Sequence, residues 1–244
     1  MAGKYIELVG VAGAGKTAIE KILVDEALRR EVPISPRGVV GRNLRLRVQT
    51  LFTIAMIVLL VPGILSLYLL RTRSAYAHTP HVNKIKRNLI TRMIVDTAVV
   101  RCLLRRSSGY LVNDEGLLGK LVSLSVLTEI TPSKMQLLVG KLLPTPAMLI
   151  YVTVPPMVAL AREHKRDVEL PFFNDMAYDL KETFFRDAVR IYTELAETEA
   201  WMSNVETVSI KNASSYDDLT KEVASVAKTL RSVVLPSKGG HFSV

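Results

Sequence analysis

The stretch that decides the fold is Tyr5-Ile-Glu-Leu-Val-Gly-Val-Ala-Gly-Ala-Gly-Lys-Thr17, close to the start of a chain of 244 residues. Its first half is an apolar run typical of a buried strand, and a helical pattern follows from Lys16 to about Arg30. The turn between them, Gly10 to Thr17, fits the pattern G-x-x-x-x-G-K-[ST]. A strand, a glycine-rich turn and a helix in this order predict a loop that binds the phosphates of a nucleoside triphosphate.

The fixed positions of this loop have separate physical roles. Glycines permit positive φ and let the backbone turn its N–H groups toward a phosphate, while the following helix directs its positive end at the same anion. We expect Lys16 to reach the β- and γ-phosphates of ATP, and the Thr17 hydroxyl to hold Mg²⁺. The predicted nucleotide-binding residues are Gly10, Val11, Ala12, Gly13, Ala14, Gly15, Lys16, Thr17 and Ala18.

Composition narrows the class of protein without selecting one function. Hydrophobic residues make up 49% of the chain, which argues against disorder and allows a sizeable core. Lys and Arg outnumber Asp and Glu by 32 to 23, for a formal charge of +9, and this balance favours anionic partners. The one cysteine, Cys102, stands among apolar residues, so we expect a buried structural thiol. The histidines show no transition-metal spacing, and no secretory signal begins the chain, so we expect a cytoplasmic protein.

Residues 50–70 carry no charge and are flanked by arginines on both sides. The stretch is long enough for a transmembrane helix, but a single crossing would separate the phosphate loop from every later site element. Pro62-Gly63 instead predicts a turn between two short helical arms. Two readings stay open: a helical pair that packs on the core or covers the substrate cleft, and a hairpin that contacts a membrane or a lipid substrate.

A second nucleotide motif is predicted after the strand that begins at Tyr110. This short apolar run ends in Asp114-Glu115-Gly116. An acid at the carboxyl end of a neighbouring strand can coordinate Mg²⁺ opposite the phosphate loop. We therefore expect Thr17 and Asp114 to be the metal-binding residues, and Asp114 or Glu115 to orient an acceptor or a water molecule.

Further strands and helices alternate along the chain, which implies right-handed crossovers and a parallel sheet. The sequence predicts an α/β, three-layer P-loop NTPase fold with a parallel five-stranded sheet flanked by helices, plus a hydrophobic helical insertion. Other strands are expected at 147–154 and 205–210, and long helices at 83–106 and 174–200. Residues 32–36 are expected to be a weak strand or a loop. The helix at 83–106 is basic, and we expect its charges on a solvated face, with one or two of the arginines pointing into the cleft as the alternative. These charges are Lys84, Lys86, Arg87, Arg92, Arg101, Arg105 and Arg106.

We expect one kinase-like domain over residues 1–235. Within it, residues 43–106 would form the helical insertion and acceptor side, and residues 155–175 the lid region. Residues 236–244 are expected to be a flexible tail.

The segment Tyr151-Val-Thr-Val-Pro-Pro-Met-Val-Ala-Leu-Ala-Arg-Glu-His-Lys-Arg166 resembles the strand, the Pro-Pro turn and the lid helix of nucleoside monophosphate kinases. Together with the two nucleotide motifs, it makes the chain most similar to thymidylate kinases. The resemblance implies that Arg162 and Arg166 close on the phosphates during transfer. The chain has Asp114-Glu115 where these kinases have Asp-Arg, and Thr153 where they have Asp. The phosphate donor side is therefore better defined than the acceptor side.

The sequence favours an ATP- and Mg²⁺-dependent small-molecule kinase whose acceptor is a nucleotide, a sugar or a lipid-linked alcohol. Its expected catalytic residues are Lys16, Asp114, Glu115, Arg162 and Arg166. The alternative is a P-loop ATPase or a nucleotide-switched binding protein, with peripheral membrane contact through residues 50–70 as a further option. The Asp-Glu pair favours this alternative, because an acid after the Mg²⁺ aspartate can position water. Nucleic-acid binding is not expected, because no recognition motif accompanies the positive charge.

Overall fold

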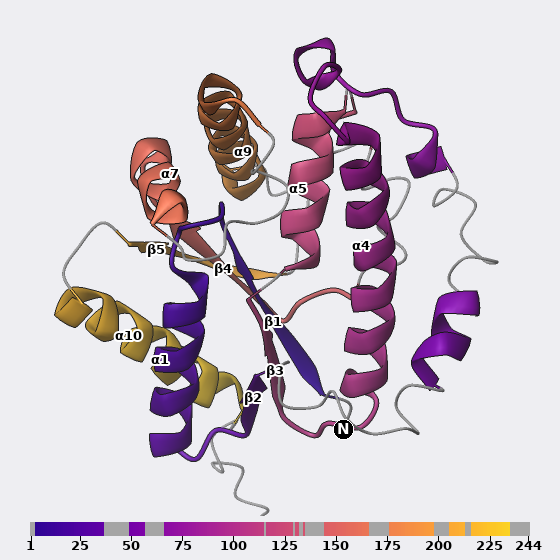
Figure 1. Ribbon diagram of the computed structural model, residues 1–244. Helices are drawn as coiled ribbons and strands as arrows, with labels where there is room; N and C mark the ends of the chain where they lie inside the picture. Colours follow the sequence, from indigo (N-terminus) through magenta and orange to yellow (C-terminus); the bar gives the residue numbers. More distant parts are fainter. Residues whose placement is uncertain are drawn as a thin grey trace, which may run out of the picture.

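The computed structural model describes residues 3–36, 49–56, 66–114, 116–128, 130–131, 134, 144–165, 176–197, 205–212 and 216–234. Over these residues the chain has a mixed α/β fold in which helices flank a parallel sheet (Figure 1). The fold class predicted from the sequence is confirmed at this level. Residues 166–175 of the predicted lid region, the tail at 236–244 and the Pro62-Gly63 turn lie outside the described residues.

The sheet has the order β2-β3-β1-β4-β5, and every neighbouring pair is parallel. Four strands have four to six residues: β1 Lys4–Val9, β3 Tyr110–Asn113, β4 Met148–Thr153 and β5 Glu206–Lys211. The edge strand β2, Ile34–Pro36, has three residues and pairs with β3. Because β1 is central, the turn that follows it lies between the carboxyl ends of β3 and β4, where open α/β sheets bind ligands.

Helices cover both faces of this sheet, as parallel strands require. α1 (Lys16–Arg29) and α10 (Tyr216–Val234) pack together on one side. α4 (Val82–Leu104), α5 (Leu117–Leu127) and α9 (Tyr178–Glu197) lie on the other side, and α7 (Pro156–His164) packs on α9 (Figure 1). The sheet and these helices enclose one large hydrophobic core.

The helix α5 has no counterpart among the predicted elements. Its sequence, Leu-Leu-Gly-Lys-Leu-Val-Ser-Leu-Ser-Val-Leu, is apolar almost throughout and lacks the period of an amphipathic helix. The structure shows why: α5 is enclosed by α4, α9 and β1, and all but two of its residues are buried.

The basic helix α4 is correctly predicted in position, but its charges are not all solvated. Lys84, Arg87 and Arg92 are exposed as expected. Lys86 is buried, and its Nζ donates a hydrogen bond to the Leu70 carbonyl. Burial, together with the positive charge of Arg87, lowers the pKa of Lys86. The expectation of a solvated charge was therefore wrong at Lys86, because the chain before α4 crosses over this position.

Parts of the uncharged stretch are helical and lie against α4. Residues 49–56 form a helix whose Thr53 hydroxyl lies 3.4 Å from the sulfur of Cys102, which is buried as predicted. Residues 66–68 are also helical, and the Tyr68 hydroxyl lies 3.2 Å from that of Thr91. Within the part of the chain that the structure describes, no helix is long and apolar enough to cross a membrane.

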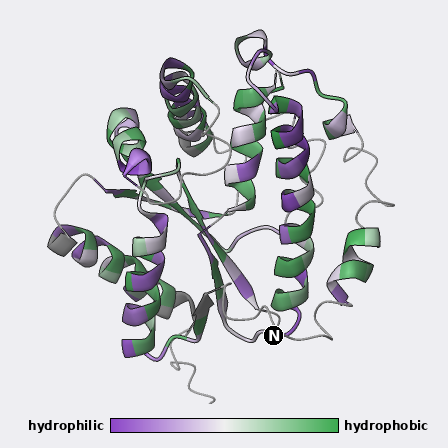
Figure 2. Ribbon diagram, in the orientation of Figure 1, coloured by the Kyte–Doolittle hydropathy of each residue, from purple (hydrophilic) through white to green (hydrophobic). Residues whose placement is uncertain are grey.

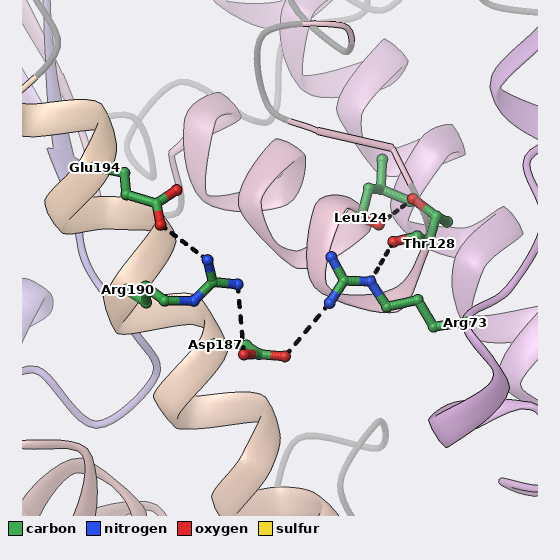
Figure 3. A network of polar contacts seen from close by, with 6 residues as sticks. All are labelled: Arg73, Leu124, Thr128, Asp187, Arg190 and Glu194. Atoms are coloured by element: carbon green, nitrogen blue, oxygen red, sulfur yellow. Dashed lines mark hydrogen bonds and ion pairs between the residues drawn. The ribbon is translucent and has the colours of Figure 1, made fainter.

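A network of polar contacts connects Arg73, in the segment between residues 66–68 and α4, with α5 and α9 (Figure 3). The Arg73 Nε donates a 2.7 Å hydrogen bond to the carbonyl of Thr128, at the end of α5. The same guanidinium lies 3.5 Å from Asp187 of α9, and Asp187 is also 3.6 Å from Arg190. These groups are partly exposed, so the network positions the segment more than it stabilises the fold.

Candidate active site

The phosphate loop is shaped by three glycines with positive φ, namely 147° at Gly10, 74° at Gly13 and 89° at Gly15. Neighbouring backbone atoms also leave no room for a side chain at Gly10 or Gly13. A Cβ at Gly10 would lie 2.6 Å from the Val152 carbonyl of β4, and one at Gly13 would overlap the Ala159 carbonyl of α7. The loop is thus held between β4 and α7 in a conformation that only glycine adopts without strain.

The helix α1 begins at Lys16, directly after Gly15, and its first turn has no acidic residue and no side-chain cap. A helix N-terminus of this kind favours an anion, through its N–H groups and its dipole. The Lys16 Nζ folds back over the loop and donates hydrogen bonds to the carbonyls of Gly10 (2.8 Å) and Val11 (2.9 Å). Of the remaining predicted residues, Val11 and Ala14 are buried supports of the loop, while Ala12 and Ala18 are not fully buried.

The second motif meets the first at Thr17. The Thr17 hydroxyl donates a 2.8 Å hydrogen bond to the Asp114 carboxylate, which follows β3 directly. A hydroxyl and a carboxylate beside a phosphate site form the oxygen donor set through which Mg²⁺ is usually bound, so these residues fit that ion. Glu115 lies outside the described residues. Among those described, no group of three or more His, Cys, Asp and Glu side chains could hold a metal ion.

Asn212, which was not predicted, connects the phosphate loop with Arg162. Its buried side chain donates a hydrogen bond from Nδ2 to the Ala14 carbonyl, and its backbone N–H donates to the Thr153 carbonyl at 3.0 Å. The Arg162 guanidinium of α7 donates a 3.1 Å hydrogen bond to the Asn212 carbonyl. Arg162 is thereby held beside the loop, while Arg166 lies outside the described residues. A polar residue directly after β5, at the carboxyl edge of the sheet, is the signal that could have indicated Asn212.

A buried acid beneath the site was also missed. Glu7 of β1 accepts hydrogen bonds from the Tyr5 hydroxyl (2.7 Å) and from the backbone N–H of Leu118, in the first turn of α5. Burial raises the pKa of Glu7 to about 7, although these hydrogen bonds and the charge of Lys120 act in the opposite direction. Lys120 itself pairs with Asp96 of α4 at 2.8 Å. Glu7 therefore joins the strand that leads into the phosphate loop to the helix that follows Asp114.

Tyr192 supports the loop from the side of α9. Its side chain is buried, and burial together with the charge of Glu7 raises the pKa of its hydroxyl. A backbone hydrogen bond with Gly10 acts against this rise. The first glycine of the loop is therefore in polar contact with a residue of α9.

No protein-family model and no curated protein sequence matches the chain. Solved structures of deoxyadenosine kinase from M. mycoides do match. The complex with dCMP and dCDP has a TM-score of 0.53 at 12% identity, over 94% of this chain and 99% of the other. The complex with dCTP gives 0.54 at 10% identity, over 92% and 99%, and the complex with dATP gives 0.53 at 12% identity, over 93% and 99%.

These likenesses extend over almost the whole of both chains, so the chain shares the fold of a nucleoside kinase. At 10–12% identity they concern the fold alone. The resemblance to thymidylate kinases in particular stays a prediction.

Proposed function

We propose that this protein is a kinase that transfers the γ-phosphoryl group of ATP to a small-molecule acceptor and requires Mg²⁺. The observation that carries the proposal is the 2.8 Å contact between Thr17 and Asp114, directly beside the loop Gly10–Thr17. Arg162 approaches the same loop through Asn212. The likeness to solved structures of deoxyadenosine kinase supports a phosphotransferase.

The residues of the site would act through position and charge. Phosphoryl transfer needs little covalent help from the protein beyond alignment and positive charge around the transferred group. The Lys16 ammonium, which contacts two loop carbonyls, would exchange them for phosphate oxygens. Arg162, with Arg166, would approach the transferred group from the side of the lid. Thr17 and Asp114 would hold Mg²⁺, which would neutralise charge on the phosphates.

The acceptor would be a nucleotide, a sugar or a lipid-linked alcohol. A thymidylate kinase-like activity is the narrowest form of the proposal, and it rests on the segment around Arg162. For a hydroxyl acceptor, Asp114 or Glu115 would orient or deprotonate the attacking oxygen; a phosphate acceptor needs no base. Peripheral contact with a membrane would bring a lipid-linked acceptor within reach of the site.

An ATPase is the second candidate, because two adjacent acids follow β3 at Asp114 and Glu115. In that case Glu115 would position a water molecule, and hydrolysis of the nucleotide would drive a conformational change instead of phosphoryl transfer to an acceptor.

The deciding experiment follows γ-labelled ATP with nucleosides, nucleoside monophosphates, sugars and polyprenols as acceptors, using the wild-type chain and the Lys16→Ala variant. A kinase gives slow ATP turnover alone and labelled product with one acceptor class. The ATPase proposal predicts hydrolysis without any acceptor. If that hydrolysis requires Glu115 but tolerates Arg162→Ala and Arg166→Ala, the kinase proposal is wrong.

A further inference from the structure

The positive charge of the chain is concentrated in one segment. Residues 32–95 contain ten Lys and Arg and no Asp or Glu, so this segment alone has a formal charge of +10. The rest of the chain holds 22 Lys and Arg against 23 Asp and Glu and is almost neutral. A charge asymmetry of this kind indicates an anionic partner for the segment rather than for the whole protein.

The described part of this segment lies on and beside the face of α4 that points away from α5. Lys84, Thr91, Val95 and Cys102 are spaced by seven, four and seven residues, so they share one face of the helix. The Tyr68 hydroxyl contacts Thr91, and the Thr53 hydroxyl contacts Cys102. The helix at 49–56 and the helical turn at 66–68 therefore lie along the same face of α4, on the outside of the molecule (Figure 1).

Large apolar side chains on the helix at 49–56, and at Leu69 directly after the helical turn at 66–68, are exposed. The exposed fractions are 66% for Leu51, 68% for Phe52 and 86% for Leu69, and Met56 is 39% exposed. Figure 2 shows hydrophobic residues on the helix at 49–56, outside the body of the domain. We call these four residues, with the exposed Lys84, Arg87 and Arg92, the outer α4 surface.

Cations on this surface have no acidic neighbour within α4. Asp96, the one acid in that helix, is buried and pairs with Lys120 of α5. The exposed side of α4 thus presents Lys84, Arg87 and Arg92 around apolar residues, and this combination favours a partner that is both anionic and apolar.

We propose that the outer α4 surface docks on a membrane that contains anionic lipids. Apolar side chains such as Phe52 and Leu69 would enter the interface between head groups and acyl chains, while the flanking cations would contact phosphate groups. A second copy of the chain is a poorer partner, because the exposed cations Lys84, Arg87 and Arg92 of the two copies would repel each other. A nucleic acid would accept the cations but would gain little from exposed aliphatic side chains.

Vesicle flotation of the full-length chain tests this proposal. Vesicles of neutral phosphatidylcholine are compared with vesicles that also contain phosphatidylglycerol. The wild-type chain is expected to float with the anionic vesicles, less so with neutral ones, and less again at high salt. Replacing both cations in Arg87→Ala/Arg92→Ala should lower the partition coefficient by about 30-fold. Phe52→Ser/Leu69→Ser should lower binding to both kinds of vesicle.

Matched controls come from the rest of the chain. Leu28 of α1 is 61% exposed, and the Arg186 side chain of α9 is 69% exposed, and both lie outside the outer α4 surface. Leu28→Ser and Arg186→Ala should bind vesicles as the wild type does. All variants change exposed positions, and unchanged circular dichroism shows that their folds are intact.

Three results would overturn the proposal. The first is a wild-type chain that does not float with anionic vesicles. The second is an equal loss of binding in Phe52→Ser/Leu69→Ser and Leu28→Ser. The third is a surface that binds only single-stranded nucleic acid, or only a second copy of the chain. None of these readouts uses phosphotransfer, so they separate this proposal from the proposed kinase activity.

Discussion

The Thr17 hydroxyl and the Asp114 carboxylate lie 2.8 Å apart, although 97 positions separate them in the sequence. Each follows the end of a strand, β1 for the loop that leads to Thr17 and β3 for Asp114, and these strands are neighbours. Parallel pairing brings the carboxyl ends of both strands to one edge. The contact is thus a direct product of the strand order, and it marks where we expect the metal ion.

The Asp114→Asn variant tests that position. The amide oxygen can still accept the hydrogen bond of Thr17, but the negative charge that attracts Mg²⁺ is lost. We expect the Mg²⁺ concentration for half-maximal phosphotransfer to rise by about tenfold or more. A magnesium titration of the initial rate measures this change. Asp25→Asn, at an exposed position on α1, is the control. An unchanged titration curve for Asp114→Asn would remove Asp114 from the metal site.

Removal of the loop cation should have a larger effect on rate. In Lys16→Ala the two hydrogen bonds to Gly10 and Val11 are lost together with the charge that would face the phosphates. We expect the turnover rate to fall by about 10²-fold or more. The control is Lys21→Ala, an exposed lysine on the same helix. Equal rates in the two variants would mean that the loop takes no part in phosphotransfer.

The sequence predicts much of the part of the site that would bind the phosphate donor, because most of its residues are adjacent in the chain. The loop from Gly10 to Thr17 depends on glycines, a lysine and a helix start that are adjacent in the chain, so a short pattern suffices to recognise it. Asp114, the acid after β3, is almost as easy to predict from the sequence, because an apolar run that ends in Asp114 predicts both the strand and its carboxyl end. The fold class followed from the same alternation of strands and helices.

Residues whose roles depend on distant partners could not be predicted in this way. The position of Asn212 directly after β5 places it at the carboxyl edge of the sheet, but the local sequence does not specify Ala14 as its partner. Lys86 belongs to a basic run and becomes buried because residues near Leu70 cross over it. α5 is buried on nearly all sides, so its sequence carries no helical period to detect.

Arg162 and Asn212 should have separable effects. Arg162 donates to the backbone carbonyl of Asn212, so Asn212→Ala keeps that bond and removes only the hydrogen bond to Ala14. We expect Asn212→Ala to raise the KM for ATP through a looser loop. Arg162→Ala should instead lower kcat by about 10²-fold, because its charge would act on the transition state.

Steady-state kinetics at varied ATP concentration distinguish these outcomes. Arg186→Ala, at an exposed position on α9, provides the background effect of losing an arginine. If Arg162→Ala changes the KM for ATP alone, the residue binds ground-state ATP and does not stabilise the transition state.

The buried acid Glu7 should make the stability of the protein fall as the pH rises. Burial raises its pKa from an ordinary value of 4.5 to about 7 in the folded state. Below pH 4.5 the carboxyl is protonated in both states. Between the two values it ionises only in the unfolded chain, so the folded state binds more protons and the free energy of unfolding declines with pH. Above pH 7 the group is ionised in both states and the decline ends.

The shift in the pKa of Glu7 corresponds to a fall of about 3 kcal/mol in the free energy of unfolding between pH 4.5 and about pH 7. Urea unfolding of the wild type and of Glu7→Gln at several pH values between 4 and 8.5 measures it, because the difference between the two proteins cancels the other titrating groups. The Glu7→Gln variant keeps an oxygen for the Leu118 N–H and should gain stability relative to the wild type as the pH rises. Glu222→Gln, on the exposed side of α10, should show no such trend. A difference between wild type and Glu7→Gln that does not vary with pH would mean that Glu7 is ionised throughout this range, held by Leu118 and Lys120.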